Sequence, residues 1–375
     1  MTENTLVTDD FQMIALQEQL SAANKDKQSL AIVGANTKAF LGREIDPNNN
    51  AVATLPVAAY KGIVDYEPSE LVLTARCGTP LSDIEKVLSE QRQMLAFEPP
   101  QFTAQSTLGG TLASGLSGPR RISCGAARDF ILGTNILNGQ GQYLRFGGQV
   151  MKNVAGYDVS RLMVGSMGTL GVIMQASLKV LPMPEREITL AKRMSEQQAL
   201  EQMTQYSCSG LPISGSCYHG QTLSLRLSGS KARLQQAEQR IGGEKLGDKV
   251  AERFWQQLRD QRLGFFADSQ TMLEAGNALW RLSVPLATPP LALSGQQLFE
   301  WHGALRWLYT DMRPERIGAE LEKVNGFAQC YRGGDRQADV FQPVNSGLAA
   351  IQQRLKQAFD PNAIFNAERF SLNPS

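Results

Sequence analysis

Three glycine-bearing segments have the residue types that bind an anion without charged side chains. They are Gly34 to Lys38, Ser106 to Gly110 and Gly115 to Gly118. Glycine permits positive φ angles and a close backbone approach to a ligand, because no Cβ stands in the way. Successive backbone N–H groups can then hold a phosphate. We therefore expect these segments to bind the pyrophosphate of a dinucleotide. The alternative is that they are tight turns of a glycine-rich β domain.

The pattern excludes the two best-known phosphate-binding motifs. The segment GANTKAF, which starts at Gly34, lacks GxGxxG, and no acidic residue follows at the usual distance on a next strand. A Walker A motif is absent as well. A dinucleotide bound here needs a different fold.

Few side chains suit metal binding or acid–base catalysis. The two histidines, His219 and His302, cannot form a metal site without other ligands, and a surface or loop position is the simplest interpretation of each. The cysteines are odd in number and form no CxxC pair, which excludes a recognisable zinc or iron–sulfur framework and fits a reducing compartment. They are Cys77, Cys124, Cys208, Cys217 and Cys330. We predict no metal site.

Three arginines are candidate clamps for a carboxylate or a phosphate. Arg120, Arg121 and Arg128 follow the second and third glycine segments, and a guanidinium can bind a carboxylate through two parallel hydrogen bonds. The preferred alternative is that they form structural salt bridges or contact a cofactor phosphate.

Composition places the chain among ordinary globular proteins. It has 375 residues, of which 42% are hydrophobic and 19% charged, and its net charge is +1. Two or three domains are expected, and nothing argues for a nucleic-acid partner. The polar N-terminus has no signal-peptide pattern, and no run reaches the ~18 apolar residues of a transmembrane segment. We expect a cytoplasmic protein, with peripheral attachment to the inner membrane through a partner as the alternative.

The first half of the chain predicts short, mixed elements. Residues 8–22 have a helical apolar pattern, and a buried strand at 30–33 runs into the first glycine segment. Thr79 and Pro80 open a second helix. Fourteen of the 34 glycines lie from position 109 to 171, where strand-like pieces alternate with turns, and Asn138 to Gly141 predicts a hairpin.

The second half predicts a compact α+β region followed by one more helix. All four tryptophans lie here, and we expect them in the core. They are Trp255, Trp280, Trp301 and Trp307. Strands are expected at 188–193, 222–228, 279–284 and 304–309, and helices at 195–206, 230–241 and 249–263. A polar connector, 335–346, leads to a last helix at 347–359.

Three motifs lie in order between Ser106 and Ile173: STLGGTLASGLSG, GAARDFILGTNIL and KNVAGYDVSRLMVGSMGTLGVI. Together they resemble the FAD-binding domain shared by vanillyl-alcohol oxidase, p-cresol methylhydroxylase and the bacterial D-2-hydroxy acid dehydrogenases. The resemblance implies an α+β fold in which two subdomains hold an extended FAD. A smaller α+β cap-like domain and a C-terminal return segment would follow. The expected parts are 1–184 for the FAD-binding domain, 185–334 for the cap-like domain and 335–375 for the connector, helix and return.

The resemblance also implies which residues contact the cofactor. The first phosphate loop matches around Gly34, the second around Gly109, and the last strand at Gly171. The matching residues are Gly34, Asn36, Thr37, Lys38, Thr107, Gly109, Gly110, Ser114, Gly118, Gly168, Gly171, Val172 and Ile173. Met167 stands where relatives often have glutamate. FAD is expected to be non-covalent, because the first loop has no histidine or cysteine for attachment.

Motifs along nearly the whole chain are similar to the E-subunit family of bacterial glycolate oxidase. Among them are KAFLGR, SGPRR, ALWRLSVP and LRWL. The resemblance implies an FAD-binding subunit that works with a larger flavin subunit and an iron–sulfur subunit. Such a complex oxidises a small 2-hydroxy acid, glycolate with D-lactate as a second candidate, to the 2-oxo acid. The alternatives are a self-sufficient D-2-hydroxy acid dehydrogenase and a non-catalytic assembly subunit.

The catalytic residues are not identifiable from the sequence. Oxidation of a 2-hydroxy acid needs a base for the hydroxyl proton while hydride goes to the flavin, and neither histidine lies in a motif that would aim it there. Lys152 could place positive charge near a reduced flavin, with a loop-surface position as the alternative. We therefore expect the chain to be inactive without its partner subunits.

Overall fold

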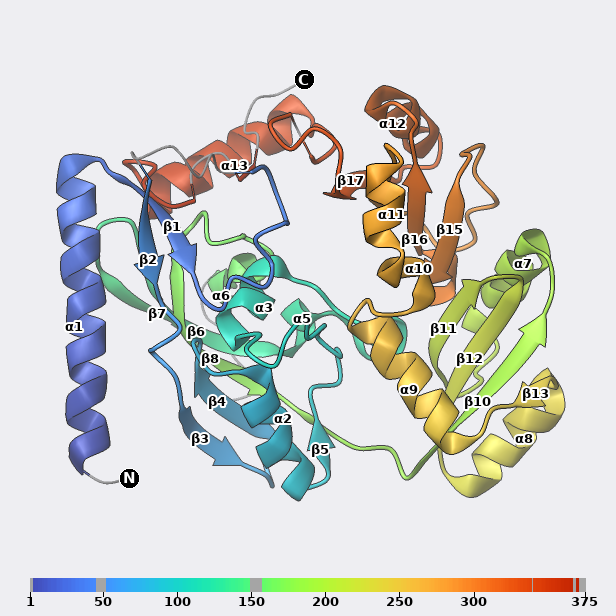
Figure 1. Ribbon diagram of the computed structural model, residues 1–375. Helices are drawn as coiled ribbons and strands as arrows, with labels where there is room; N and C mark the ends of the chain where they lie inside the picture. The colour runs from blue at the N-terminus through green and yellow to red at the C-terminus, as the bar shows by residue number, and fades with distance from the viewer. Residues whose placement is uncertain (1–2, 45–51, 149–156, 339, 367–368, 371–375) are drawn as a thin grey trace.

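The computed structural model describes residues 3–44, 52–148, 157–338, 340–366 and 369–370. It has an α+β architecture, as predicted, in which one part is built on a five-stranded sheet and another on an eight-stranded sheet (Figure 1). The division of the chain at residues 184 and 334 stays a prediction.

The five-stranded sheet is formed by residues from the first half of the chain. Its strand order is β3-β4-β8-β6-β7, and every neighbouring pair is antiparallel. The predicted hairpin is confirmed, because Asn138 N–H donates to Gln142 O at the β6–β7 turn, 3.1 Å away. The strands are β3 (Ile63–Glu67), β4 (Val72–Arg76), β6 (Ile131–Leu137), β7 (Tyr143–Gly147) and β8 (Val172–Lys179).

Short helices cover this sheet and form its core with it. The predicted second helix is confirmed as α2 (Leu81–Glu90), whose Leu81, Ile84 and Leu88 are fully buried. Deep burial of this apolar stripe against the sheet is the main force that holds α2 in place. The other helices are α3 (Leu108–Ser114), α4 (Arg121–Cys124), α5 (Ala127–Phe130) and α6 (Val159–Met163), and β5 (Gln93–Met94) pairs with β9 (Leu181–Pro182).

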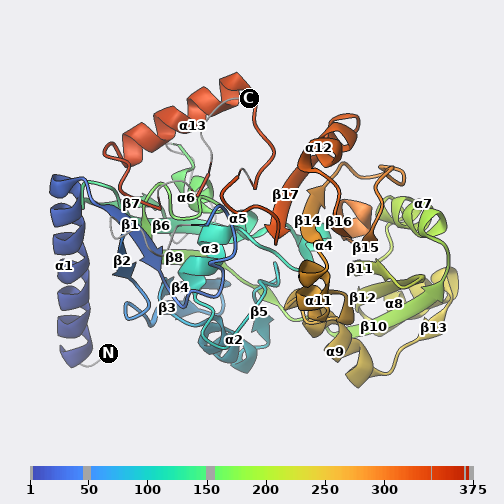
Figure 2. The same ribbon diagram turned by 45° about the horizontal axis from the view of Figure 1, so that its top comes forward.

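The N-terminal and C-terminal segments lie against each other. Helix α1 (Glu3–Asp26) is longer than predicted and leads to β1 (Ser29–Val33), which pairs in parallel with β2 (Val52–Pro56). Phe365 forms an isolated bridge with Leu30 and is fully buried. The last helix, α13 (Ser346–Phe359), therefore brings the C-terminal segment back to β1, beside α1 (Figure 2).

The eight-stranded sheet is antiparallel throughout and has the order β13-β10-β12-β11-β15-β16-β14-β17. All four tryptophans are buried around it, which confirms their predicted core position. Its strands are β10 (Arg186–Arg193), β11 (Ile213–His219), β12 (Thr222–Gly229), β13 (Glu244–Lys245), β14 (Ala278–Ser283), β15 (Gln296–Glu300), β16 (Leu305–Thr310) and β17 (Phe327–Arg332). Its helices are α7 (Glu196–Ser207), α8 (Lys231–Ile241), α9 (Asp248–Arg259), α10 (Gly264–Ala267), α11 (Ser269–Glu274), α12 (Pro314–Glu322) and the 3-10 turn η1 (Trp301–Gly303).

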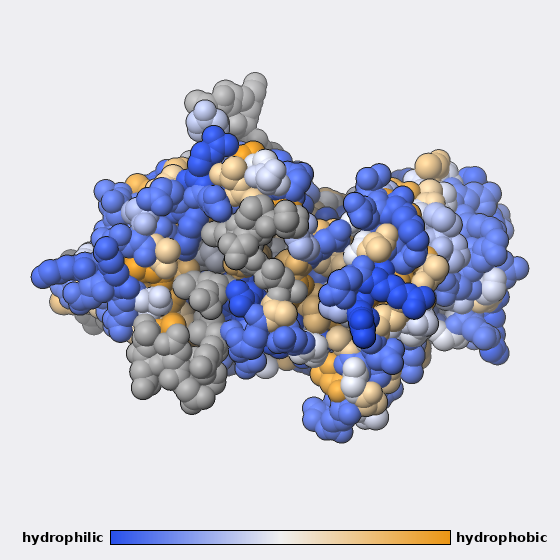
Figure 3. All heavy atoms as spheres, turned by 90° about the horizontal axis from the view of Figure 1, so that it is seen from above, coloured by the Kyte–Doolittle hydropathy of each residue, from blue (hydrophilic) through white to orange (hydrophobic). Residues whose placement is uncertain are grey.

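The outer surface is mostly hydrophilic, with small scattered apolar patches on the face seen in Figure 3. Among the described helices, none combines the length and the apolar composition that a membrane span requires.

Candidate FAD-binding site

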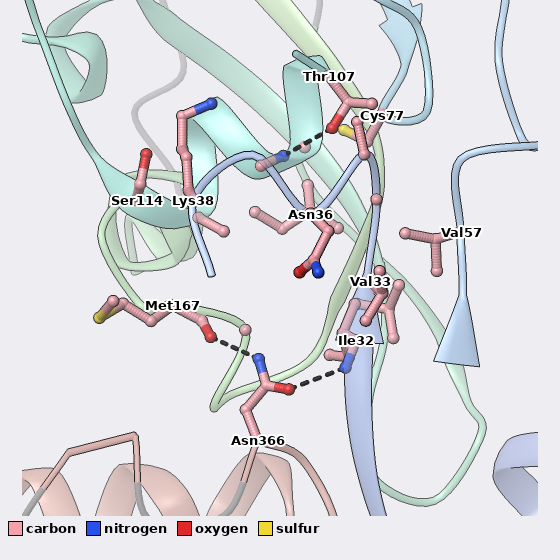
Figure 4. A pocket seen from close by; sticks show the side chains of 18 of the residues that line it. Ile32, Val33, Asn36, Lys38, Val57, Cys77, Thr107, Ser114, Met167 and Asn366 are labelled. Atoms are coloured by element: carbon pink, nitrogen blue, oxygen red, sulfur yellow. Dashed lines mark hydrogen bonds between the residues drawn. The ribbon is translucent and has the colours of Figure 1, made fainter. Parts of the chain in front are cut away.

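One pocket lies where the loop after β1, helix α3 and the start of β8 meet, and we call it the glycine pocket (Figure 4). The structure brings twelve of the thirteen predicted cofactor residues to its walls. These are Gly34, Asn36, Thr37, Lys38, Thr107, Gly109, Gly110, Ser114, Gly168, Gly171, Val172 and Ile173. They come from segments more than 130 residues apart in the sequence, so the fold is what joins them.

The first wall is the loop that follows β1. A Cβ on Gly34 would lie 2.8 Å from Thr107 Oγ1, so only glycine lets this loop approach α3 so closely. Asn36 adopts a positive φ of 55°, a conformation that asparagine tolerates better than most residues. Among the described residues, no group accepts a hydrogen bond from the backbone N–H groups of 34–38. These donors are therefore available to a phosphate.

Lys38 adds a positive charge to this wall. Its Nζ is buried, and no described group accepts a hydrogen bond from it. It lies 5.6 Å from the centre of the Phe102 ring, a cation–π contact that compensates only part of the lost hydration. Burial lowers the pKa of Lys38 to about 8. A buried ammonium group without an anionic partner is the charge that a phosphate in this pocket would neutralise.

The second wall is the first turn of α3, where the expected role of the glycines needs correction. Gly109 N–H donates to Cys77 O at 2.7 Å, and Gly110 N–H donates to the capping Thr107 Oγ1 at 3.2 Å. These two N–H groups are already occupied and are not free donors for a phosphate. A Cβ on Gly109 would lie 2.9 Å from Cys77 Cβ, whereas one on Gly110 would meet only Thr107 Oγ1, at 3.3 Å. Gly109 thus allows close packing, and Gly110 keeps the pocket open.

The third wall joins β8 to the C-terminal segment. Gly168 has a φ of +72°, and a Cβ there would lie 2.6 Å from Asn366 Nδ2. That amide donates to Met167 O at 2.7 Å, and its Oδ1 accepts from Ile32 N–H at 2.8 Å, as Figure 4 shows. Asn366 therefore ties together β1 and the loop before β8.

Sequence reasoning missed several residues of the pocket. Arg369 lines it and donates to the carbonyl oxygens of Ala39 and Leu41 at 2.8 and 2.6 Å, which holds the C-terminal segment over the first loop. Cys77 also lines it, and burial raises the pKa of its thiol far above the usual value. The C-terminal return segment implied by the resemblance was the only signal for the contribution of Arg369, and nothing in the sequence indicated Cys77.

Gly118 was predicted to contact the cofactor, but the structure places it elsewhere. Its N–H donates to Phe97 O at 2.9 Å, and its own carbonyl accepts from Trp301 Nε1 at 3.0 Å. A Cβ at this position would lie 2.3 Å from Glu98 O. Gly118 therefore serves the contact between the two sheet-based parts of the chain, and its N–H is not available to a phosphate.

The structure shows protein contacts for two of the three candidate anion clamps. Arg120 is buried and forms ion pairs with Glu98 and Glu187, so the salt-bridge alternative is correct for it. Arg121 stacks on the Trp301 ring at 4.2 Å, and Arg128 is exposed. Lys152 lies outside the described residues.

His302 was predicted to lie on the surface or in a loop; it lies in a turn, but it is buried. It is 7% exposed, and its Nδ1 forms no hydrogen bond with any residue that the structure describes. It lies in the left-handed region with φ 55°, between Trp301 (φ 53°) and Gly303 (φ 82°) in the turn from β15 to β16. Burial lowers the pKa of His302 to about 4. His219 is exposed, as predicted.

Acid should therefore destabilise the protein through His302. The unfolded chain protonates this imidazole near pH 6.5, whereas the folded chain keeps it neutral down to about pH 4. Between pH 6.5 and about pH 4 the unfolded state binds more protons than the folded state. The free energy of unfolding should therefore fall by on the order of 2 kcal/mol as the pH drops through this range. Urea unfolding at pH 7 and pH 4.5 measures this change in the free energy of unfolding. His302→Asn, which tolerates the left-handed backbone and does not titrate, should lose that part of the pH dependence. An unchanged pH dependence in the variant would refute this assignment.

Comparisons with known proteins identify the family of the chain. A family model for an FAD binding domain matches residues 14–147. The chain is 45% identical over 355 residues to glycolate oxidase subunit GlcE of Escherichia coli (strain K12), an alignment that covers 95% of this chain and 96% of that protein. It is 34% identical over 130 residues to glycolate oxidase subunit GlcD of Bacillus subtilis (strain 168), covering 34% of this chain and 27% of that protein.

The fold also matches a solved structure. Alkyldihydroxyacetonephosphate synthase in crystal form P1 superposes with a TM-score of 0.63 at 14% identity, covering 93% of this chain and 74% of that one. At this identity the likeness shows the fold alone, and it confirms the predicted α+β class. The relationship to the Escherichia coli subunit is close and spans nearly both chains, so this chain belongs to the GlcE family of glycolate oxidase subunits, with an FAD binding domain in its N-terminal part.

Proposed function

We propose that this chain is the flavin-carrying E subunit of a complex that oxidises glycolate, with FAD bound non-covalently in the glycine pocket. The observation that carries the proposal is the convergence of twelve predicted residues around a pocket that holds a buried, unpartnered lysine. A pocket with free backbone donors and a buried, unpartnered ammonium group has the chemistry that a dinucleotide phosphate needs. FAD supplies the hydride acceptor for oxidation of a 2-hydroxy acid.

The residues of the pocket have distinct roles in this proposal. The N–H groups of residues 34–38 donate to the pyrophosphate, and the Lys38 ammonium neutralises part of its charge. Gly110 leaves space at α3, and Asn366 fixes the loop before β8 against β1. Each of these groups binds or orients the cofactor, and none transfers a proton.

Non-covalent attachment follows from the side chains that line the pocket. Among the described lining residues there is no histidine, and the one thiol is that of Cys77. Its strongly raised pKa makes the thiolate rare, and the thiolate is the reactive nucleophile. A covalent bond to flavin therefore has no suitable nucleophile in these walls.

The attachment can be tested on the purified protein. We expect a yellow protein whose flavin passes into the supernatant when the chain is precipitated with acid or heat, and chromatography should identify the released flavin as FAD. A flavin that stays with the precipitated chain would contradict non-covalent binding. A colourless protein that takes up no added FAD would contradict the cofactor itself.

Substrate oxidation is assigned to the assembled complex. The described lining residues of the glycine pocket include no aspartate, glutamate or histidine to accept the hydroxyl proton. General-base assistance is typically worth roughly 10²–10⁴ in rate, so the isolated chain should oxidise glycolate or D-lactate poorly. We propose that a larger flavin subunit carries out this step, that an iron–sulfur subunit passes the electrons on, and that the complex is cytoplasmic or peripheral to the inner membrane.

A further inference from the structure

The chain returns from α13 to β1 through residues 360–366, which we call the return turn. Leu30 N–H donates to Ile364 O at 2.6 Å, and Asn366 N–H donates to Leu30 O at 2.8 Å. Phe365, which lies between them, is fully buried. These bonds place the return turn beside β1, which leads into the first wall of the glycine pocket. The return turn ends at Asn366, which lines that pocket (Figure 4).

Asp360 fixes the shape of the return turn. Its side chain is fully buried. Its Oδ1 accepts from Ile364 N–H at 3.0 Å, and its Oδ2 accepts from Phe365 N–H at 2.8 Å. Hydrogen bonds to a charged acceptor are stronger than those between neutral groups. The return turn therefore depends on a buried negative charge, and such a charge needs a cation that compensates it.

Lys356, in the last turn of α13, supplies that cation. Its Nζ donates to Asp360 Oδ2 at 2.6 Å, to Thr169 O at 2.8 Å and to Phe365 O at 3.1 Å. These three acceptors use all three N–H groups of the ammonium. Thr169 lies in the loop before β8, next to Gly168 of the glycine pocket. Lys356 therefore joins α13, the return turn and the loop before β8.

We propose that Lys356 and Asp360 are positioning residues for FAD, and that their ion pair sets how fast FAD is released. Neither is among the described residues that line the glycine pocket. Asp360 acts through the return turn that ends at Asn366, and Lys356 acts also through the loop before β8. Together they hold the third wall of the pocket against β1, and FAD leaves when this wall moves away. The inference rests on the proposed function and names residues that maintain its site.

The first measurement follows FAD release from the full-length protein. The FAD-loaded protein is diluted, and the flavin that passes an ultrafiltration membrane is measured over time. Lys356→Met leaves the Asp360 carboxylate buried without its cation, so the wall should open more often and release should be faster by about tenfold or more. Asp360→Asn should also speed release. Because both residues act through one ion pair, the double variant should release FAD about as fast as Lys356→Met, whereas independent effects would multiply.

The second measurement needs no flavin. Hydrogen exchange of the amides of residues 364–366, which donate to Asp360 and Leu30, is followed in the flavin-free protein by mass spectrometry. Lys356→Met should speed this exchange by about tenfold or more. The control variant is Leu321→Ala, which truncates a fully buried side chain of α12 in the part built on the eight-stranded sheet. It should lower the urea midpoint of unfolding and leave the rate of FAD release unchanged.

Unchanged FAD release or unchanged exchange in Lys356→Met would overturn the positioning role. Multiplying effects in the double variant would overturn it as well, and so would faster release in Leu321→Ala, because any loss of stability would then act alike. If Lys356→Met does not fold, Asp360→Asn decides by the same two measurements. An unmodified protein that binds no FAD contradicts the proposed function and this inference with it, whereas bound FAD with an unchanged release rate in the variant contradicts this inference alone.

Discussion

Replacing Gly110 with valine should abolish FAD retention while leaving the fold intact. The side chain would point into the glycine pocket, because a Cβ at this position meets only Thr107 Oγ1, at 3.3 Å. The Thr107 side chain must shift by a few tenths of an ångström to accommodate the valine, but a ligand lying against α3 cannot share its space. Flavin per protein, measured from the visible and ultraviolet spectrum after gel filtration, should fall from near stoichiometric to near zero. Far-ultraviolet circular dichroism should be unchanged.

The matched control is Gly318→Val on α12, where an added Cβ has no neighbour within 4 Å. It should keep its flavin. Gly109→Val is unsuitable, because its Cβ would collide with Cys77 at 2.9 Å and destabilise the fold itself. If Gly110→Val retains full FAD occupancy, the second glycine segment is only a turn and the cofactor binds elsewhere.

Replacing Glu98 with glutamine should destabilise the protein by about 3–5 kcal/mol. Glu98 forms ion pairs with two buried arginines, at 3.2 Å with Arg120 and at 2.9 Å with Arg226 of β12. Arg120 also reaches Glu187 of β10 at 2.6 Å, so the network connects the two sheet-based parts. Burial alone would raise the pKa of Glu98, and the arginines outweigh it, so that the pKa lies below its usual value. Removing the carboxylate leaves buried positive charge uncompensated.

Urea unfolding at pH 7 measures this loss. The control is Lys323→Met, which removes the exposed partner of Glu320 and should cost less than about 1 kcal/mol. A Glu98→Gln variant within 1 kcal/mol of the unmodified protein would mean that the network contributes little to stability.

The elements of the fold with a clear local periodicity were predictable. Helix α2 and strand β8 have clear apolar patterns, and both were found. Strands β11, β15 and β17 were missed. β11 is buried at six successive positions and contains Gly215, Ser214 and Ser216. A central strand covered on both faces shows no alternation, and small polar residues hide its burial.

The candidate site was predictable only where a motif marked it. The glycine loops carried the resemblance, and the fold gathers all of their predicted residues except Gly118. The charge environment was not predictable, because the burial of Lys38 depends on Phe102, and the wall near Gly168 depends on Asn366, almost 200 residues away. The burial of His302 was not predicted for the same reason, because nothing in the sequence of Trp301–Gly303 indicates a buried turn with a left-handed backbone.

We propose that this chain carries FAD but needs its partner subunits to oxidise glycolate. The most direct measurement is anaerobic mixing of the FAD-loaded chain with glycolate while the visible flavin band is followed. We expect the yellow colour to persist with the chain alone and to bleach when the larger flavin subunit is added. Rapid bleaching by the isolated chain would contradict the claim and identify a self-sufficient dehydrogenase.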